Sequence, residues 1–425
     1  MSAPASLSFE VLLSSARPKV VAALLRYFRD LDTAEDAFQE ASMRALKAWP
    51  KNGPPRDATA WLIFVGRNIG IDAARRRKRQ APLPDEAMLS DLEDAEHAAV
   101  EKLDDSDYRD DILRLLFVCC HPDLPAAHQV ALALRIVCGV PMPRIARAFL
   151  ASEAAMEQRL TRAKAKIAAA GIAFEAPDAV ERTERLATVM SMVYLVFNEG
   201  YTQREAASPG DRRAAASLFC EEAIRLARLL LRLYPADPEL MGLTALMLLQ
   251  HARAEARLDA SGAPVLLDDQ DRSLWNRDLI GEGLALLDKA VRHVSPGPYQ
   301  LQAAIAALHA RARTPTDTDW RGIERLYRTL ERLDPSPVVT LNRAVAVWKC
   351  DGAAAALDLV KPLGDALSGY FYFHGLRGGL LSDLGRPREA REAFNRAIAL
   401  AQSPADAAHI RAHLDRLQDA SATLG

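Results

Sequence analysis

The chain has 425 residues, of which 50% are hydrophobic and 26% charged, so it can bury a large core and is not globally disordered. Its 54 basic and 56 acidic side chains give a formal charge of -2, which excludes a simple polycationic coat for nucleic acid. A near-neutral total does not exclude basic and acidic segments that are separated along the chain. At roughly 150 residues per domain, the length predicts about three domains. The abundance of Ala, Leu and Arg over aromatic residues predicts an all-α fold.

Cysteine usage and hydropathy predict a cytoplasmic protein without a membrane partner. Five cysteines do not make a disulfide framework for a chain of this length, which favours a reducing compartment. The N-terminal residues 1–10 lack the basic start and apolar core of a secretory signal. The apolar runs 229–231 and 246–249 are far shorter than the ~20 residues that a membrane span requires.

The first segment with a chemical pattern runs from Thr33 to Trp49, where a helix is predicted with Thr33 as its cap. Small and aromatic residues form one narrow apolar stripe: Ala34, Ala37, Phe38, Ala41 and Ala45. Asp36, Gln39 and Glu40 lie away from the centre of the stripe, where they are free to meet a partner. The alternative is an ordinary solvated face.

A second helix is predicted from Thr59 to about Arg79. Its apolar face contains Leu62, Val65, Ile69 and Ala73, and its neighbouring polar face contains Asn68, Asp72, Arg75 and Arg79, with Arg76 beside it. A helix edge that runs from an amide through a carboxylate into a basic cluster can hold phosphates and touch base edges. Trp61 offers a stacking surface for unpaired bases. The alternative is a solvated basic helix end that the helix dipole favours.

The charge changes sign after this helix and changes again further on. Residues 84–111 contain twelve carboxylates against Lys102 and Arg109, which predicts a solvated acidic linker. A short helix is then predicted within residues 140–150, followed by a turn and a basic helix that Ser152 caps. Helix, short turn and capped basic helix form the helix-turn-helix pattern, although this pattern has many false positives among Ala-rich helices.

The motifs Asp32–Glu40, Ala60–Leu62 and Gly66–Arg76, in this order and with this spacing, resemble region 2 of an extracytoplasmic-function (group IV) sigma factor of bacterial RNA polymerase. The resemblance implies that Asp36, Gln39 and Glu40 contact core polymerase at the clamp helices of its β′ subunit. It also implies that the second helix and the loop 53–59 before it recognise and open the promoter −10 element. The residues expected to contact the −10 DNA are Trp61, Asn68, Asp72, Arg75 and Arg76.

The second basic segment resembles region 4 of the same family, which binds the promoter −35 element and lies against the β flap of the polymerase. The matching residues are Ser152, Glu153, Gln158, Arg159 and Arg162. This chain departs from the family pattern at Ala155 and Glu157, where a Thr and a basic residue are common. The acidic linker fits a family segment that threads polymerase channels, and it equally fits a plain spacer.

Cys119, Cys120 and His121 form a cluster that invites a zinc hypothesis. Adjacent cysteines lack the two-residue spacing of common zinc motifs, and an apolar helix precedes them. Core packing is the preferred interpretation, because free Cys is among the most buried residue types. No metal or cofactor is therefore expected.

The remaining half of the chain is predicted to be a helical extension that resembles tetratricopeptide (TPR) repeats. Around residues 384–398, the small residues Ala390, Ala393 and Ala397 allow close helix approach, with Phe394 and Ile398 as larger contacts. This extension resembles the C-terminal domain of a sigma subgroup and is expected to carry a regulatory protein or ligand. Asp271, Arg272 and Trp275 are interpreted as structural rather than as a ligand site. The predicted boundaries are 1–82 for region 2, 83–110 for the linker, 111–175 for region 4 and 176–425 for the extension.

A sigma factor that binds core RNA polymerase and directs promoter recognition and opening is the leading hypothesis. The alternatives are a TPR-type adaptor and a helix-turn-helix repressor that binds duplex DNA without polymerase. An enzyme is not expected, because no convergent acid, base and nucleophile can be assembled from the sequence.

Overall fold

The computed structural model comprises two compact units, residues 1–196 and 197–425, which are described separately. The residues that it describes are 4–79, 105–121, 123–149, 151–169, 179–203, 211–259, 265–293, 296–401, 407–408, 410–411 and 413–417. Every regular element within these ranges is helical, which confirms the predicted all-α class. The predicted domain boundaries stay predictions, because the division between the units falls inside one helix, α9 (Ala179–Gln203).

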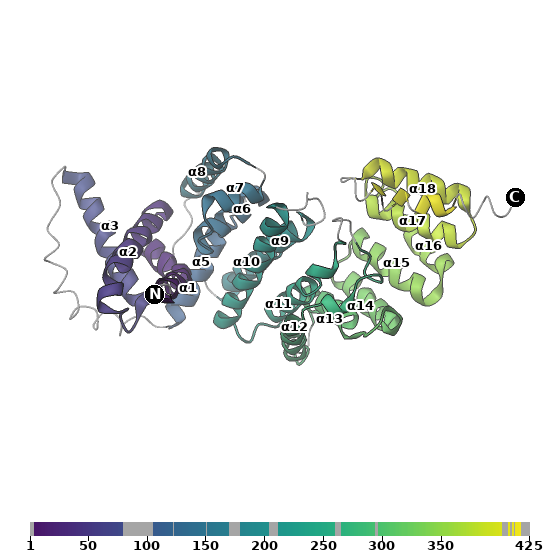
Figure 1. Cartoon of the computed structure of the whole chain (residues 1–425), viewed down its shortest axis with the longest axis horizontal. Coiled ribbons are helices and arrows are strands. Elements are labelled where there is room, and N and C mark those ends of the chain that lie inside the picture. The colour runs from purple at the N-terminus through teal and green to yellow at the C-terminus, as the bar shows by residue number, and fades with distance from the viewer. Residues whose placement is uncertain are drawn as a thin grey trace. The chain divides into compact units, whose positions relative to one another are not determined.

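The first unit begins with three helices that contact one another (Figure 1). They are α1 (Pro4–Phe28), α2 (Leu31–Asn52) and α3 (Ala58–Arg79). A second group follows the acidic segment and consists of α5 (Asp105–Cys119), α6 (Ala126–Leu132), the π-helix η2 (Ala133–Val137), α7 (Met142–Ala148) and α8 (Glu153–Ala169). α1 contacts both α5 and η2, so the two groups pack as one body.

The apolar stripe predicted on α2 is confirmed, but the predicted cap is wrong. Ala34, Ala41 and Ala45 are completely buried, and Ala37 and Phe38 nearly so. The helix begins three residues earlier than a Thr33 cap implies, because Asp30, in an extended conformation, accepts the backbone N–H of Thr33 at 2.7 Å. α2 ends at Gly53, whose φ of 80° suits glycine, and Asp57 then caps α3 by accepting the N–H of Ala60.

Part of the predicted acidic linker is helical. Residues 105–110 form the start of α5, and residues 83–104 lie outside the described residues. Asp111, the last carboxylate of the acidic run, is 2% exposed and pairs with Arg114 Nη1 at 3.0 Å and Arg26 Nε at 3.4 Å. A carboxylate between two guanidinium groups can be buried without leaving its charge unpaired, which composition alone does not reveal.

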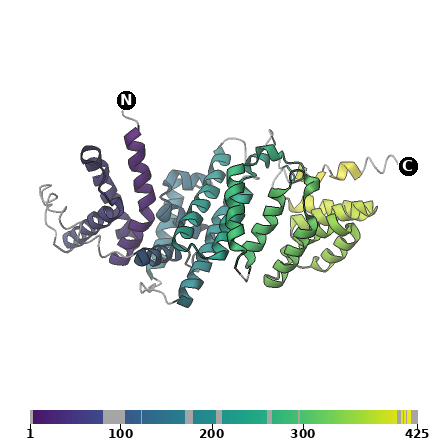
Figure 2. The ribbon, with the colours of Figure 1, turned by 90° about the horizontal axis from the view of Figure 1, so that it is seen from below.

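The second unit is a succession of helices that begins with the end of α9. Four of its described α-helices, α11, α13, α15 and α18, have Pro as their first residue, where the missing N–H costs no helical hydrogen bond. The helices after α9 are α10 (Asp211–Leu233), α11 (Pro238–His251), η3 (Ala254–Ala256), η4 (Arg272–Leu274), α12 (Arg277–Ala290), α13 (Pro298–Arg311), η5 (Pro315–Asp317), α14 (Trp320–Leu333), α15 (Pro337–Asp351), α16 (Ala353–Val360), η6 (Lys361–Leu363), α17 (Phe371–Asp383) and α18 (Pro387–Leu400). Figure 2 shows them following one another, and contacts join α11 to α13, α13 to α14, α14 to α15 and α17 to α18.

The close helix approach predicted around Ala390 and Ala393 is confirmed in the α17–α18 pair. Ala390, Ala393, Phe394 and Ala397 are buried, whereas Ile398 is only partly buried. Phe394 packs so tightly on Gly378 that a Cβ added to this glycine would lie 2.5 Å from the ring. The helix pair is therefore present, and its assignment to a TPR repeat stays a prediction.

Cysteine burial agrees with the core-packing interpretation. Cys119, Cys120, Cys138 and Cys220 are buried and Cys350 is partly buried, all as free thiols. Burial raises the pKa of Cys119 to about 12 and the pKa of Cys120 well above its usual value, so both thiols are inert. Within the described ranges, no group of three His, Cys, Asp or Glu side chains is arranged to hold a metal ion. None of the described helices is long and apolar enough to cross a bilayer.

Candidate functional site

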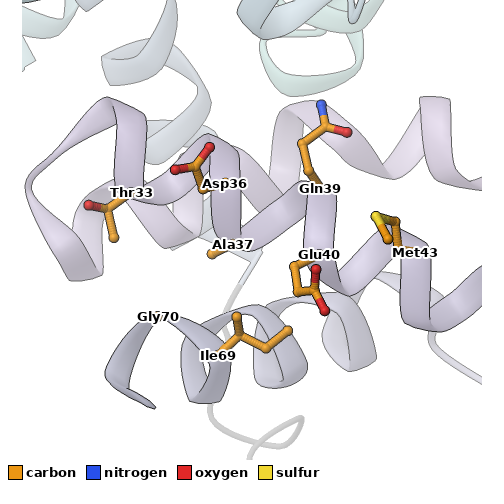
Figure 3. A pocket seen from close by; sticks show the side chains of 8 residues that line it. All are labelled: Thr33, Asp36, Ala37, Gln39, Glu40, Met43, Ile69 and Gly70. Carbon is orange, nitrogen blue, oxygen red and sulfur yellow. The ribbon is translucent and has the colours of Figure 1, made fainter. Parts of the chain in front are cut away.

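A pocket of about 340 Å³ lies between α2 and α3 in the first unit (Figure 3). Its floor is apolar and its rim carries carboxylates and an amide. The lining residues are Thr33, Asp36, Ala37, Gln39, Glu40, Met43, Ile69 and Gly70. The three predicted polymerase contacts, Asp36, Gln39 and Glu40, thus lie together on one face of α2 beside this pocket.

The polar rim of the pocket is open to solvent. Asp36 and Gln39 are exposed, and Glu40 is half-buried with its carboxylate 3.7 Å from Arg44 one turn along the helix. Met43 is 51% exposed, and Leu46, about one turn further along the same helix, is 46% exposed. An exposed apolar strip with acidic side chains beside it suits a basic amphipathic segment of a protein partner. We call the surface formed by Asp36, Gln39, Glu40 and Met43 the α2 face.

The structure places only part of the predicted −10 surface of α3. Asn68 is half-buried, and Trp61 is half-buried with its ring edge-on to that of Trp49 at 5.6 Å. This ring contact packs the start of α3 against the end of α2. The stacking of Trp61 on an unpaired base stays a prediction. The side chains of Asp72, Arg75 and Arg76 lie outside the described residues, although their backbone is helical.

The residues predicted to form the −35 surface lie at the start of α8 and on its solvent-exposed part. Ser152 caps this helix as predicted, accepting the N–H of Ala155 at 3.2 Å. Its buried stripe consists of Met156, Leu160, Ala163 and Ile167. The residues predicted to contact DNA lie away from the stripe, with Glu153, Gln158 and Arg162 exposed and Arg159 half-buried.

Arg159, Arg162 and Lys166 place positive charge along one side of α8, close to His128. The pKa of His128 on α6 is lowered by partial burial and then by the nearby charges of Arg159, Lys166 and Arg162. Lys166 Nζ donates to the carbonyl oxygen of Asp123 at 2.7 Å, which ties α8 to the turn before α6. A basic helix side with a neutral histidine beside it can hold phosphate groups.

One buried ionic cluster on α2 was not predicted from the sequence. Glu35 is 7% exposed, and three cations converge on its carboxylate. Arg17 Nη2 lies 3.1 Å and Arg135 Nε 3.5 Å from Oε1, and Lys164 Nζ lies 3.0 Å from Oε2. The only sequence signal is the position of Glu35, which lies about 60° from Phe38 on a helical wheel and so flanks the apolar stripe.

The aromatic and charged residues before α12 are structural, as interpreted from the sequence. Arg272 is buried over the Trp275 ring, 4.7 Å from its centroid. Its Nη1 donates to the carbonyl oxygens of His309 at 2.8 Å and Ala312 at 2.7 Å, which caps the end of α13. Asp271 accepts the N–H of Ser273 and caps the short helix η4.

Comparison with known proteins identifies two matched segments and one relative. Sigma-70 region 2 matches residues 12–80, which contain α2 and α3 and most of α1. A family of unknown function (DUF6596) matches residues 185–291, from α9 to the turn after α12. Uncharacterized protein R00370 of Rhizobium meliloti (strain 1021) is 65% identical over 415 residues, covering 98% of this chain and 97% of that protein.

The chain belongs to the family of this Rhizobium protein. Its sigma-70 region 2 supports a role as an RNA polymerase sigma factor, with core RNA polymerase and promoter DNA as the partners that such a region implies. This chain therefore combines a sigma-70 region 2 match in its first unit with a DUF6596 match that begins in α9 and extends through α12.

Proposed function

We propose that this protein is a group IV sigma factor that docks on core RNA polymerase through the α2 face, recognises promoter DNA and opens it. The observation that carries the proposal is the position of the α2 face within the region 2 match. The pocket is lined by Asp36, Gln39 and Glu40, and these side chains are exposed or half-buried rather than buried in the helix bundle. The resemblance to region 2 makes the clamp helices of the β′ subunit the proposed partner of this surface.

The DNA-facing part of the proposal rests on two helices. α3 would read and open the −10 element with Asn68, Asp72, Arg75 and Arg76, and Trp61 would stack on an unpaired base. α8 would read the −35 element with Gln158, Arg159 and Arg162, close to the β flap of the polymerase. At the start of α8, backbone N–H groups beside Ser152 would meet phosphate, and the Glu153 carboxylate would accept a hydrogen bond from a base edge.

The helical C-terminal part is proposed to be regulatory. Its TPR-like helix pairs are suited to binding a protein partner, because stacked pairs of this kind present extended surfaces. The burial and internal contacts of Arg272 take this residue out of such a surface.

The docking assignment is tested by reversing charge on the α2 face. The double variant Gln39→Lys, Glu40→Lys should bind core polymerase at least about tenfold more weakly, because like charges would meet across the interface. Glu392→Lys, at an exposed position of α18, is the matched control for charge reversal. Binding is measured by fluorescence anisotropy of labelled full-length protein with purified core polymerase.

Equal affinity of the double variant and the control would contradict docking through the α2 face. Circular dichroism of both variants checks that the helix content is unchanged. Because Gln39 is exposed and Glu40 half-buried, neither substitution disturbs the buried stripe of α2.

A further inference from the structure

The first unit holds its two predicted DNA-binding parts against each other. α1, from the region 2 match, buries Val20, Val21 and Leu24 and contacts α3, α5 and η2. The contact also contains polar links, since Arg17 Nε donates to the carbonyl oxygen of Ile136 at 2.9 Å and Arg26 pairs with Asp111. The predicted −10 and −35 helices therefore belong to a single closed body in this structure.

Lys164 ties the predicted −35 helix directly to α2. Its Nζ lies 2.6 Å from Asp32 Oδ1 and 3.0 Å from Glu35 Oε2, two carboxylates one turn apart. Burial lowers the pKa of Lys164, but hydrogen bonds to Asp32 and Glu35 outweigh burial, so the pKa is raised overall and the ammonium stays charged. The side chains of Lys164 and Glu35 are 17% and 9% exposed, so solvent screens this pair less than a surface pair.

A closed first unit is too small to read both promoter elements at once. The positions −10 and −35 are about 25 base pairs apart, which is ~85 Å of B-DNA at 3.4 Å per base pair. A compact body of 196 residues has a radius of gyration of about 16 Å and is about 42 Å across. The two helix groups must separate before α3 and α8 can occupy the two elements together.

We propose that the ion pair of Lys164 with Asp32 and Glu35 is a latch that keeps α8 on α2 in the free protein. The proposal rests on the proposed sigma-factor function, because only simultaneous promoter contact requires the latch to open. Asp32 is 64% exposed and lies one helical turn before Asp36 of the α2 face. A cation of a partner that docks on this face can therefore replace Lys164 at Asp32, which couples docking to release of α8.

The latch is tested by measuring the distance between α2 and α8 in the full-length protein. Spin labels are placed at exposed positions with Lys47→Cys and Ala168→Cys, in a Cys350→Ser background that leaves only the four buried native cysteines. Double electron–electron resonance then gives the distance distribution. We expect one short distance in the free wild-type protein. In Lys164→Met the ratio of open to closed molecules should be about tenfold higher. This variant should still fold, because Glu35 keeps two other cations, Arg17 and Arg135.

Matched variants separate the latch from general effects of charge and folding. Lys166→Met removes an ammonium two residues away that bonds Asp123 rather than α2, and it should leave the distance short. Lys164→Arg keeps a cation and should also stay closed. Asp32→Asn removes only the exposed partner and should open the protein to a smaller extent, which decides the question if Lys164→Met loses helix content.

Addition of core polymerase distinguishes failure of the latch from failure of the proposed function. The wild-type protein should change to the long distance when it binds polymerase on promoter DNA. The latch is contradicted if Lys164→Met and Asp32→Asn keep the wild-type distribution, or if transcription proceeds while the distance stays short. Absence of any polymerase binding contradicts the proposed function, while the free-protein distances still decide whether Lys164 holds α8 on α2.

Discussion

Replacing Arg162 by Gln should weaken promoter binding in a way that depends on salt. Arg162 is exposed on α8 at a position that the resemblance to region 4 predicts to contact −35 DNA, so we expect it to contact one phosphate. Loss of one phosphate contact makes the slope of log K against log salt less steep by about 0.9. Between about 50 and about 200 mM salt, a fourfold change, the advantage of wild type over the variant should shrink by a factor of about 3.5.

The assay measures the affinity of the polymerase-bound protein for duplex promoter DNA at increasing salt concentrations, with fluorescence anisotropy as the readout. Glu157→Gln, at another exposed position of the same helix, should tighten binding at low salt, because Glu157 repels phosphate. Arg292→Gln, an exposed position in the second unit, should leave the slope unchanged. A wild-type slope in Arg162→Gln would refute the placement of this side chain against a phosphate.

Two further predictions concern the second unit. Gly242→Ala should lower the free energy of unfolding by about 1–3 kcal/mol, because the new Cβ would lie 2.6 Å from the Gln300 backbone nitrogen. Gly281→Ala meets no atom within 4 Å and should raise the free energy of unfolding by up to about 1 kcal/mol. Urea unfolding measures both variants, and destabilisation of equal size would contradict the packing of α11 on α13. Burial and the charges of Arg253 and Arg272 lower the pKa of His309 to about 4, below its unfolded value of about 6.5, so the unfolded state binds more protons in this window. Stability should therefore fall by up to about 3 kcal/mol from pH 6.5 to pH 4, and His309→Phe should flatten this dependence in unfolding titrations; an unchanged slope would contradict it.

Local patterns in the sequence predicted those features that depend on neighbouring residues. The stripe of Ala34, Ala37, Phe38, Ala41 and Ala45 follows helical periodicity, and burial confirms it. The Ser152 cap and the close packing around Ala390 and Ala393 were likewise predictable from residue type and spacing. The start of α2 is predicted three residues late because Thr33 and Asp30 are both good caps, and only the extended backbone of Asp30 distinguishes them.

Contacts between distant segments could not be read from the sequence. Glu35 is joined to Arg135 and Lys164, which lie 100 and 129 residues further along the chain, and no local pattern pairs them. Asp111 has the composition of a solvated acidic run, yet Arg26 and Arg114 allow it to be buried. Tertiary pairing therefore decides whether a carboxylate belongs to a surface or to an interface.

The most direct test of the sigma-factor assignment is run-off transcription by purified core polymerase with this protein on its own promoter. The assignment predicts a discrete transcript that requires the protein and that decreases sharply with the Gln39→Lys, Glu40→Lys variant. DNA binding without any polymerase-dependent transcript would contradict it and would favour a repressor.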